Sequence, residues 1–445
     1  MAPINPVLDS ETRILLNHNP WWESEFSFDN DTDLIKLKDK KFIRQVDWFE
    51  NLKKGIYILR GPRQVGKTTA IKQKILQLTK KYSPGEILYL NVTNYSNKEL
   101  DILLTKFLSL NKQIKFIFID EISYIENWSK LIKSISDFGF FEGKTVILTG
   151  SNTLDMRYEY ETMPGRTGEG KRIIAKPVSY KEYLELVCGI KIDLPKKMYN
   201  QIDFLNAKFE EYLLTGGLPA VINDYLSTGK INDSFYDIYI KWIIGDIEKY
   251  RFKSNTAKAI LKKVIASLGS KVSWESLNEY AGVSHVTVAE YIDVLERSFL
   301  VNYYYNATSG SVDSKKRKKI YFLDPFFYFC VYKWIFGEIN MYSKAYSMLK
   351  DTKLLGLIKE NCVSSFLWQQ IVGLSDTIDY KTKIFFFSPS RGKEVDFVFD
   401  NICLEVKSED SNRQSGIVLT KDKFEKNKIP LAIFLLYPPT EFKKR

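Results

Sequence analysis

Short continuous apolar runs alternate with helix-like stretches along the first part of the chain. Four such runs lie at residues 56–59, 87–90, 116–119 and 145–148, and they are almost free of polar positions. Strands that are buried on both faces carry this continuous pattern, and their alternation with helices is typical of a parallel sheet. We therefore expect an α/β domain over residues 38–178, with a helix that begins at residue 67 and ends near residue 80.

The pattern divides the rest of the chain into further segments. A polar N-terminal arm over residues 1–37 contains Trp21 and Trp22, and the apolar spacing over residues 179–255 is helical, with a turn at residues 216–219. The helical spacing predicts a lid or linker. Residues 256–324 show two short helical patterns separated by Gly282 and then apolar runs at 303–305 and 320–323. This order predicts a winged helix-turn-helix.

A second α/β unit is predicted over residues 325–445. A helical pattern covers residues 354–370, and short apolar runs typical of strands follow at 384–387, 395–399, 402–406 and 431–436. The predicted fold class is thus α/β, with a helical lid and a winged helix between a parallel-sheet domain and a smaller α/β domain.

The loop between the first predicted strand and the helix that begins at residue 67 has the residues of a phosphate site. Its glycines allow backbone N–H groups to surround a phosphate, Lys67 can reach the β and γ phosphate oxygens, and the hydroxyl of Thr68 can bind magnesium. A strand before the loop and a helix after it are the context that this chemistry requires. We predict that ATP and Mg²⁺ are bound by Gly61, Pro62, Arg63, Gln64, Val65, Gly66, Lys67, Thr68 and Thr69 in a P-loop NTPase.

An acidic pair, Asp120 and Glu121, directly follows the apolar run at residues 116–119. In a P-loop enzyme, Asp120 would hold Mg²⁺ through water, and Glu121 would act as the general base for the attacking water. Hydrolysis of ATP is therefore the expected reaction. A solvent-facing acidic pair is the alternative, and the position after a phosphate loop disfavours it.

Two further roles stay open at the level of the sequence. Asn152 or Ser151, after the run at 145–148, either senses the γ phosphate or forms a plain turn. Arg157 or Arg166 either stabilises the transition state across a subunit boundary or is a solvated loop arginine.

Composition limits the partners and the compartment. The formal net charge of +11 makes nucleic acid a plausible partner, although dispersed lysines can also simply solvate a surface. The four cysteines form no C-x-x-C pair, which disfavours a structural zinc site and favours a reducing compartment. The sequence shows neither a signal-like start nor an apolar run of membrane-spanning length, so a cytoplasmic location without membrane association is expected.

The predicted winged helix offers a candidate DNA contact. The helix after Gly282 would expose His285, Thr287, Glu290 and Arg297, and the basic run at residues 315–319 would lie on the hairpin, where it could neutralise phosphates. A winged helix that only packs or contacts protein is the alternative, because the exposed helix face is weakly basic.

Carboxylates in the C-terminal unit suggest a second site. Asp396 and Glu405 lie on neighbouring predicted strands, Lys407 alternates onto the same face as Glu405, and Glu360 on the preceding helix could complete a metal site. Two carboxylates and a lysine can bind magnesium and activate water against a phosphodiester. The placement favours a restriction-endonuclease-like fold, and a salt-bridged cluster without activity is the alternative.

Together these motifs resemble a group of prokaryotic AAA-type ATPases, with archaeal members, that join a P-loop domain, a winged helix and a C-terminal restriction-endonuclease-like domain. The resemblance rests on residues 61–69, 119–121, 148–151, 164–166, 216–219 and 320–325, and on residues 394–397 with 405–407. It implies an AAA+ core with ATP and Mg²⁺, a homo-oligomer such as a hexamer, and a nuclease-like module whose activity differs between members.

Two functional hypotheses follow. In the first, ATP turnover moves the winged helix and the nuclease-like domain on DNA. In the second, the nucleotide state gates a protein partner, and the C-terminal domain is an inactive scaffold.

Overall fold

The computed structural model describes residues 10–23, 29, 31–150, 167–308, 311–312, 317–372, 380–389, 394–407, 416–425 and 427–442. The chain forms two compact units, Met1–Ala175 and Lys176–Arg445. The first contains a five-stranded sheet and the second an eight-stranded sheet.

Five parallel strands form the centre of the first unit. They are β1 (Gly55–Arg60), β2 (Ile87–Asn91), β3 (Phe116–Asp120), β4 (Thr145–Gly150) and β5 (Arg172–Ile174). Their spatial order is β2-β3-β4-β1-β5, and each neighbouring pair is parallel. The first four are the strands that the continuous apolar runs predict, so this part of the prediction is confirmed. Because the strands are parallel, their carboxyl ends meet at one edge of the sheet.

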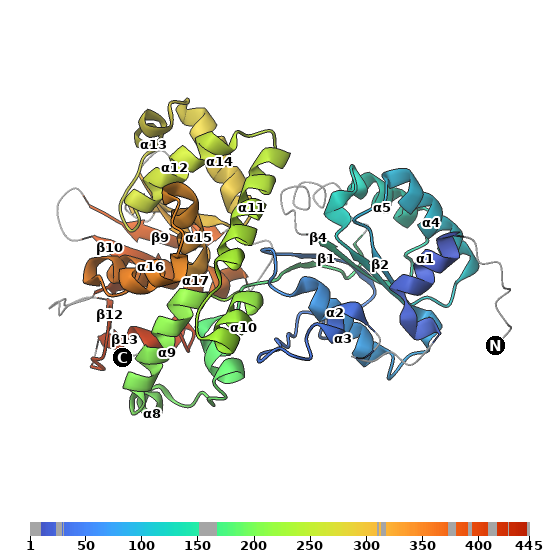
Figure 1. Ribbon diagram of the computed structural model, residues 1–445, viewed down its shortest axis with the longest axis horizontal. Coiled ribbons are helices and arrows are strands. Elements are labelled where there is room, and N and C mark those ends of the chain that lie inside the picture. The colour runs from blue at the N-terminus through green and yellow to red at the C-terminus, as the bar shows by residue number, and fades with distance from the viewer. Residues whose placement is uncertain are drawn as a thin grey trace. The chain divides into compact units, whose positions relative to one another are not determined.

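Helices cover both faces of this sheet. In Figure 1, α3 (Lys67–Leu78) lies on one face, whereas α4 (Asn97–Leu110) and α5 (Trp128–Asp137) lie on the other. The face toward α4 and α5 contributes alternate strand residues to one hydrophobic core, namely Ile56, Ile58, Leu88, Leu90, Ile117, Ile119, Val146 and Leu148. Because side chains alternate along a strand, Tyr89, Phe118 and Asp120 lie on the face toward α3.

Part of the predicted N-terminal arm folds onto the edge strand β2. The arm contains α1 (Ser10–His18), the 3-10 turn η1 (Pro20–Trp22) and α2 (Thr32–Ile35). The indole nitrogens of Trp21 and Trp22 both donate to the carbonyl oxygen of Ile87, at 3.2 and 3.0 Å. The arm therefore covers a sheet edge, a place where backbone groups would otherwise lack partners. Two more 3-10 turns, η2 (Pro84–Glu86) and η3 (Ile122–Tyr124), complete the unit.

The second unit begins with helices, as the apolar spacing predicts. They are α7 (Tyr180–Glu182), the π-helical turn η4 (Tyr183–Val187), α8 (Pro195–Tyr199), α9 (Ile202–Thr215), α10 (Pro219–Thr228), α11 (Asp233–Lys249), α12 (Ser254–Ala266), α13 (Trp274–Ala281) and α14 (His285–Arg297). After the first strands follow α15 (Pro325–Phe336), α16 (Met341–Met348) and α17 (Thr352–Val372). Within the described ranges, no helix combines the length and the apolar character that crossing a membrane requires.

The strands of the second unit form one mixed sheet. They are β6 (Val301–Thr308), β7 (Ser311–Val312), β8 (Lys318–Phe322), β9 (Ile384–Phe387), β10 (Val395–Phe399), β11 (Ile402–Val406), β12 (Ile417–Thr420) and β13 (Lys428–Pro430), with the short turns η5 (Tyr380–Thr382) and η6 (Pro439–Phe442) beside them. The first residues of β6 pair with β8, and Asn306 and Ala307 of the same strand pair with β9. The hairpin of the predicted winged helix and the C-terminal strands therefore belong to one sheet.

One predicted strand is wrong. Residues 431–436 begin with a short helix, α18 (Leu431–Phe434), which follows β13 directly. The residues of α18 are all buried, and a short apolar run that is buried on every side has no periodicity that separates a helix from a strand.

Asp324 links two turns that are far apart in the chain. Its Oδ2 accepts a hydrogen bond from the backbone N–H of Gly217 at 2.8 Å, and its Oδ1 accepts one from Phe326 N at 2.9 Å, where α15 begins. The residue is only 1% exposed. Both turns belong to the motifs that carry the family resemblance, and their mutual contact gives those motifs a structural role.

Replacing Asp324 by alanine is expected to lower the free energy of unfolding of the second unit by about 2–4 kcal/mol, because α15 loses its N-cap and the Gly217 N–H is left buried without an acceptor. Urea denaturation followed by tryptophan fluorescence measures the loss. Asp351→Ala is the matched control, since Asp351 accepts from Leu354 N at 3.0 Å in an exposed position at the start of α17. Equal losses in the two variants would contradict the role assigned to Asp324.

Candidate functional site

The predicted phosphate loop connects β1 to α3 in the first unit. A Cβ atom on Gly61 would lie 2.2 Å from the carbonyl oxygen of Ala175, so only glycine fits where the loop passes the end of β5. Gly66 is the N-cap of α3 and has a φ of 97°, a left-handed conformation that favours glycine. A Cβ atom on Gly66 would meet no atom within 4 Å, so this side of the loop is open to a ligand.

Lys67 lies inside the loop. Its ammonium donates to the carbonyl oxygens of Gly61 and Pro62, at 3.0 and 2.9 Å, and the residue is 7% exposed. Phosphate oxygens accept stronger, charge-assisted hydrogen bonds than carbonyls do. The loop therefore holds the lysine where a triphosphate can take over its hydrogen bonds.

Asp120 joins the second half of the site to the first. It is 0% exposed at the end of β3, and its Oδ2 accepts from Thr68 Oγ1 at 2.7 Å and from the Tyr89 hydroxyl at 3.1 Å. Its Oδ1 accepts from the hydroxyl of Thr149 on β4. Burial raises the pKa of Asp120 above its ordinary value, and the hydrogen bond from Thr149 opposes that rise.

The backbone turns away from the direction of β3 at Glu121, immediately after Asp120. Glu121 has a φ of 61°, in the left-handed region that few residues other than glycine adopt. Its backbone N–H donates to Thr149 Oγ1 at 3.2 Å. The backbone therefore turns sharply at Glu121, directly after the strand end that carries Asp120.

The donor set fits magnesium and a triphosphate. Magnesium prefers oxygen ligands and is commonly held by one or two protein groups together with substrate phosphates. The Thr68 hydroxyl and the Asp120 carboxylate are such groups. Among the residues that the structure describes, no group of three or more His, Cys, Asp or Glu side chains could hold a metal ion.

The other predicted residues of this site are untested. Ser151, Asn152, Arg157 and Arg166 lie outside the described residues. Two residues that contact Asp120, Tyr89 and Thr149, were not assigned a role from the sequence. Thr149 directly follows the apolar run of β4, the strand next to β3, and this position is a signal that could have identified it.

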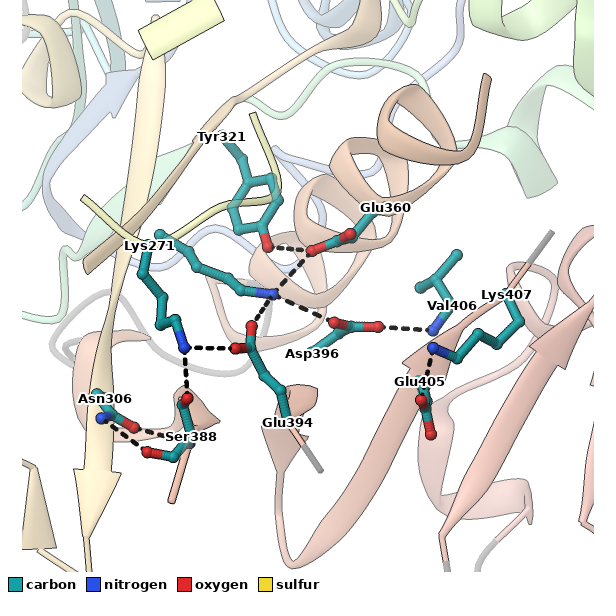
Figure 2. Close-up of polar contacts among 11 residues, drawn as sticks. Lys271, Asn306, Tyr321, Glu360, Ser388, Glu394, Asp396, Glu405, Val406 and Lys407 are labelled. Carbon is teal, nitrogen blue, oxygen red and sulfur yellow. Dashed lines mark hydrogen bonds and ion pairs between the residues drawn. The ribbon is translucent and has the colours of Figure 1, made fainter. Parts of the chain in front are cut away.

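In the second unit, one buried lysine forms ion pairs with three carboxylates. Lys319 Nζ on β8 lies 3.1 Å from Glu360 on α17, 2.9 Å from Glu394 and 3.2 Å from Asp396 on β10. Figure 2 shows these three carboxylates converging. The Tyr321 hydroxyl lies 2.5 Å from Glu360, and the ammonium of Lys271 lies 2.9 Å from Glu394. We call Lys319, Glu360, Glu394 and Asp396 the lysine cluster.

Charge balance determines the ionisation of the lysine cluster. Burial works to lower the pKa of Lys319, but the charges of Glu360, Asp396 and Glu394 outweigh it and raise that pKa. Burial raises the pKa of Glu360, and the nearby charge of Asp396 adds to the rise. Burial also opposes ionisation of Glu394, yet Lys271 and Lys319 hold the pKa of Glu394 below its ordinary value.

The predicted nuclease residues are only partly brought together. Glu360 and Asp396 share Lys319, whereas Lys407 pairs with Glu405 at 2.8 Å on β11 (Figure 2). The second oxygen of Asp396 accepts from the backbone N–H of Val406 at 2.9 Å. Lys319 was missed because it lies in a run of basic residues. Its alternation with Tyr321 on one strand face was the available signal, since both contact Glu360.

The placement of the basic run on an exposed hairpin is partly wrong. Lys318 and Lys319 are 3% and 1% exposed, because both lie in β8 within the sheet, and Arg317 before them is exposed. Lys315 and Lys316 lie outside the described residues. Helices α13 and α14 with β6 and β8 follow the predicted order of elements, and α12 precedes them. His285 and Glu290 on α14 are exposed as predicted, whereas Thr287 and Arg297 are half-buried and Arg297 pairs with Asp293 at 2.8 Å.

Comparisons with known proteins agree with the fold of the first unit. Residues 53–184 match the family model described as an AAA domain, and residues 206–334 match a domain of unknown function. An uncharacterised protein of Methanocaldococcus jannaschii is 27% identical over 324 residues, which is 66% of this chain and 64% of that protein. An uncharacterised protein of Haemophilus influenzae is 26% identical over 300 residues, 63% of this chain and 66% of that protein.

The alignments thus span slightly less than two thirds of each relative's own length. Among solved structures, the Aeropyrum pernix Orc1 protein in complex with DNA has 12% identity and a TM-score of 0.30, covering 62% of this chain and 85% of that chain. That similarity is too low to bear on function. The parallel sheet and the loop have the α/β P-loop NTPase fold, and residues 53–184 are similar to AAA domains.

Proposed function

We propose that this protein hydrolyses ATP with magnesium at the loop between β1 and α3. The observation that supports the proposal most directly is the contact between the two halves of the site. Thr68 Oγ1 lies 2.7 Å from Asp120 Oδ2, although the two residues are 52 positions apart. A hydroxyl and a carboxylate at this spacing can hold one magnesium ion together with phosphate oxygens.

Each residue of the site has a role in this reaction. Lys67 would exchange the carbonyls of Gly61 and Pro62 for phosphate oxygens, and Glu121 would take the proton from the attacking water. Magnesium, when bound, neutralises charge on the β and γ phosphates. Asn152 or Ser151 as a sensor and Arg166 from a neighbouring copy complete the proposal, which places the chain in a homo-oligomer such as a hexamer.

Phosphate release by the full chain tests this proposal. We expect release that requires Mg²⁺ and stops when EDTA removes the metal, with the Lys67→Ala variant as background. Release no higher than that background would overturn the proposal. Light scattering with and without ATP measures the mass of the particle in solution and therefore the number of copies in the proposed homo-oligomer.

We also propose that the second unit is a scaffold that does not cleave DNA. The Lys319 ammonium contacts all three carboxylates of the lysine cluster, in the space that a divalent cation would need, and Glu405 is bound to Lys407 instead. This arrangement supports the second sequence hypothesis, a nucleotide-gated switch. Plasmid DNA incubated with Mg²⁺ or Mn²⁺ should stay intact, and nicking that disappears in an Asp396→Asn variant would contradict the scaffold role.

DNA is a second candidate partner, favoured by the net charge of +11 and by the order of α12, α13, α14, β6 and β8. The burial of Lys318 and Lys319 and the exposed Glu279 and Glu290 argue against base readout. We therefore expect any binding to be independent of base sequence and to weaken steeply as salt rises.

The ATPase rate and the binding of unrelated duplexes at low and high salt measure this contact. Absence of both binding and stimulation would remove DNA as a partner. Pull-downs in ATP and in ADP would then test the protein-partner hypothesis.

A further inference from the structure

Tyr89 contacts the magnesium carboxylate from the edge strand of the first sheet. Its hydroxyl donates to Asp120 Oδ2 at 3.1 Å, and the residue is 3% exposed. In the parallel register, Tyr89 pairs with Phe118, two positions before Asp120, so the two side chains lie on the same face of the sheet. The hydroxyl therefore acts on the same oxygen that Thr68 contacts.

Lys72 fixes the ring of Tyr89. Its ammonium lies 3.9 Å from the ring centroid and 2.9 Å from Asp31 Oδ2. The side chains of Lys72 and Asp31 are both 5% exposed, and cation–π contacts are strongest when water is excluded. Lys72 also lies one turn after Thr68 on α3, so both reach the same face of the sheet. A buried polar chain thus runs from Asp31 through Lys72 and Tyr89 to Asp120.

Asn19 binds the backbone of Tyr89 from the N-terminal arm. The Tyr89 N–H donates to Asn19 Oδ1 at 2.7 Å, and Asn19 Nδ2 donates to the Tyr89 carbonyl at 2.9 Å. Asn19 is 0% exposed, and Nδ2 also donates to Leu15 O at 2.8 Å. The side-chain amide of Asn19 therefore pairs with both backbone groups of Tyr89, as a residue of a neighbouring strand would, and holds Tyr89 in place on β2.

We propose that Tyr89 is a positioning residue for Asp120, and that Asn19, Lys72 and Asp31 hold Tyr89 in that position. The proposal rests on the proposed hydrolysis of Mg²⁺-ATP. Thr68 and Asp120 would hold the metal, and the Tyr89 hydroxyl, which contacts the same Oδ2 as Thr68, would keep the Asp120 carboxylate from rotating. The N-terminal arm is then part of the magnesium site without touching the nucleotide.

The Tyr89→Phe variant tests the positioning role, because it removes only the hydroxyl. We expect the Mg²⁺ concentration for half-maximal ATP hydrolysis to rise about tenfold, while the affinity for ATP in EDTA stays unchanged. Tyr57→Phe is the matched control. Tyr57 lies on β1, is 2% exposed, and its hydroxyl accepts from Lys53 N at 2.9 Å, so its loss should leave the Mg²⁺ dependence unchanged.

The two hydrogen bonds between the Asn19 side chain and the Tyr89 backbone form a clamp on Tyr89. The Asn19→Ala variant tests this clamp through a double-mutant cycle. We expect Asn19→Ala alone to raise the Mg²⁺ requirement and to add nothing when combined with Tyr89→Phe. A normal Mg²⁺ dependence in Tyr89→Phe would overturn the positioning role, and an additive effect in the double variant would overturn the clamp. If the wild type releases no phosphate, the proposed reaction fails, and Mg²⁺-dependent binding of a fluorescent ATP analogue still measures the same shift.

Discussion

Replacing Glu121 by glutamine is expected to lower the rate of ATP hydrolysis at least about 100-fold, because glutamine cannot take a proton from the attacking water. Glutamine preserves the size of the side chain, and Asp120, Thr68 and Lys67 remain in place. We therefore expect binding of Mg²⁺-ATP to remain close to that of the wild type. Single-turnover phosphate release and equilibrium nucleotide binding measure the two quantities separately.

Glu126→Gln is the matched control for this variant. Glu126 is exposed and lies six residues after the end of β3. The Glu126→Gln variant should therefore hydrolyse ATP at the wild-type rate. A Glu121→Gln variant that keeps its rate would show that another group accepts the proton. A variant that loses Mg²⁺-ATP binding would assign Glu121 to the metal rather than to water.

Replacing Lys319 by methionine is expected to lower the free energy of unfolding of the second unit by about 3–5 kcal/mol, because Glu360 and Asp396 lose their counter-charge, whereas Glu394 keeps Lys271. Methionine is nearly as long as lysine, so the loss of stability reflects the missing charge rather than a missing volume. Urea denaturation measures the free energy of unfolding. Added Mg²⁺ or Mn²⁺ should stabilise this variant and not the wild type, since the freed carboxylates then attract a divalent cation.

Lys333→Met is the matched control for the lysine cluster. Lys333 lies 3.2 Å from both Asp233 and Asp237, but those carboxylates are 38% and 51% exposed. Its replacement should cost less than about 1 kcal/mol, because water can solvate the remaining charges. Neutralising Glu360 and Asp396 in the Lys319→Met background should recover stability. Similar losses in the Lys319 and Lys333 variants would contradict the buried-charge explanation.

The phosphate site was predictable because its information is local in the sequence. The loop at residues 61–68, the strand that ends at Asp120 and the start of α3 are each determined by residues that are close in the chain. Steric and hydrogen-bonding requirements of a phosphate loop leave little choice of residue at these positions. The strands of the first sheet were likewise recognisable, because burial on both faces leaves a continuous apolar run.

The residues that the sequence did not reveal depend on contacts between distant segments. Tyr89 is one apolar position of a buried strand until the register places it beside Asp120. Lys319 looks like any basic residue of a solvated run until β8 enters the sheet and meets α17 and β10. Residues 431–434 form a helix because tertiary packing decides between helix and strand when an apolar run is short.

Backbone hydrogen bonds on β6 tie α12, α13 and α14 to the strands that follow. Because β9 follows residue 324 and pairs with the end of β6, bending at residue 324 would have to break the hydrogen bonds between β6 and β9. The Phe322 N–H also donates to Asn361 Oδ1 on α17, at 2.7 Å. A partner that pulls on α14 would thus load α17 and Glu360 at once, so force reaches the lysine cluster through stiff backbone rather than through a hinge.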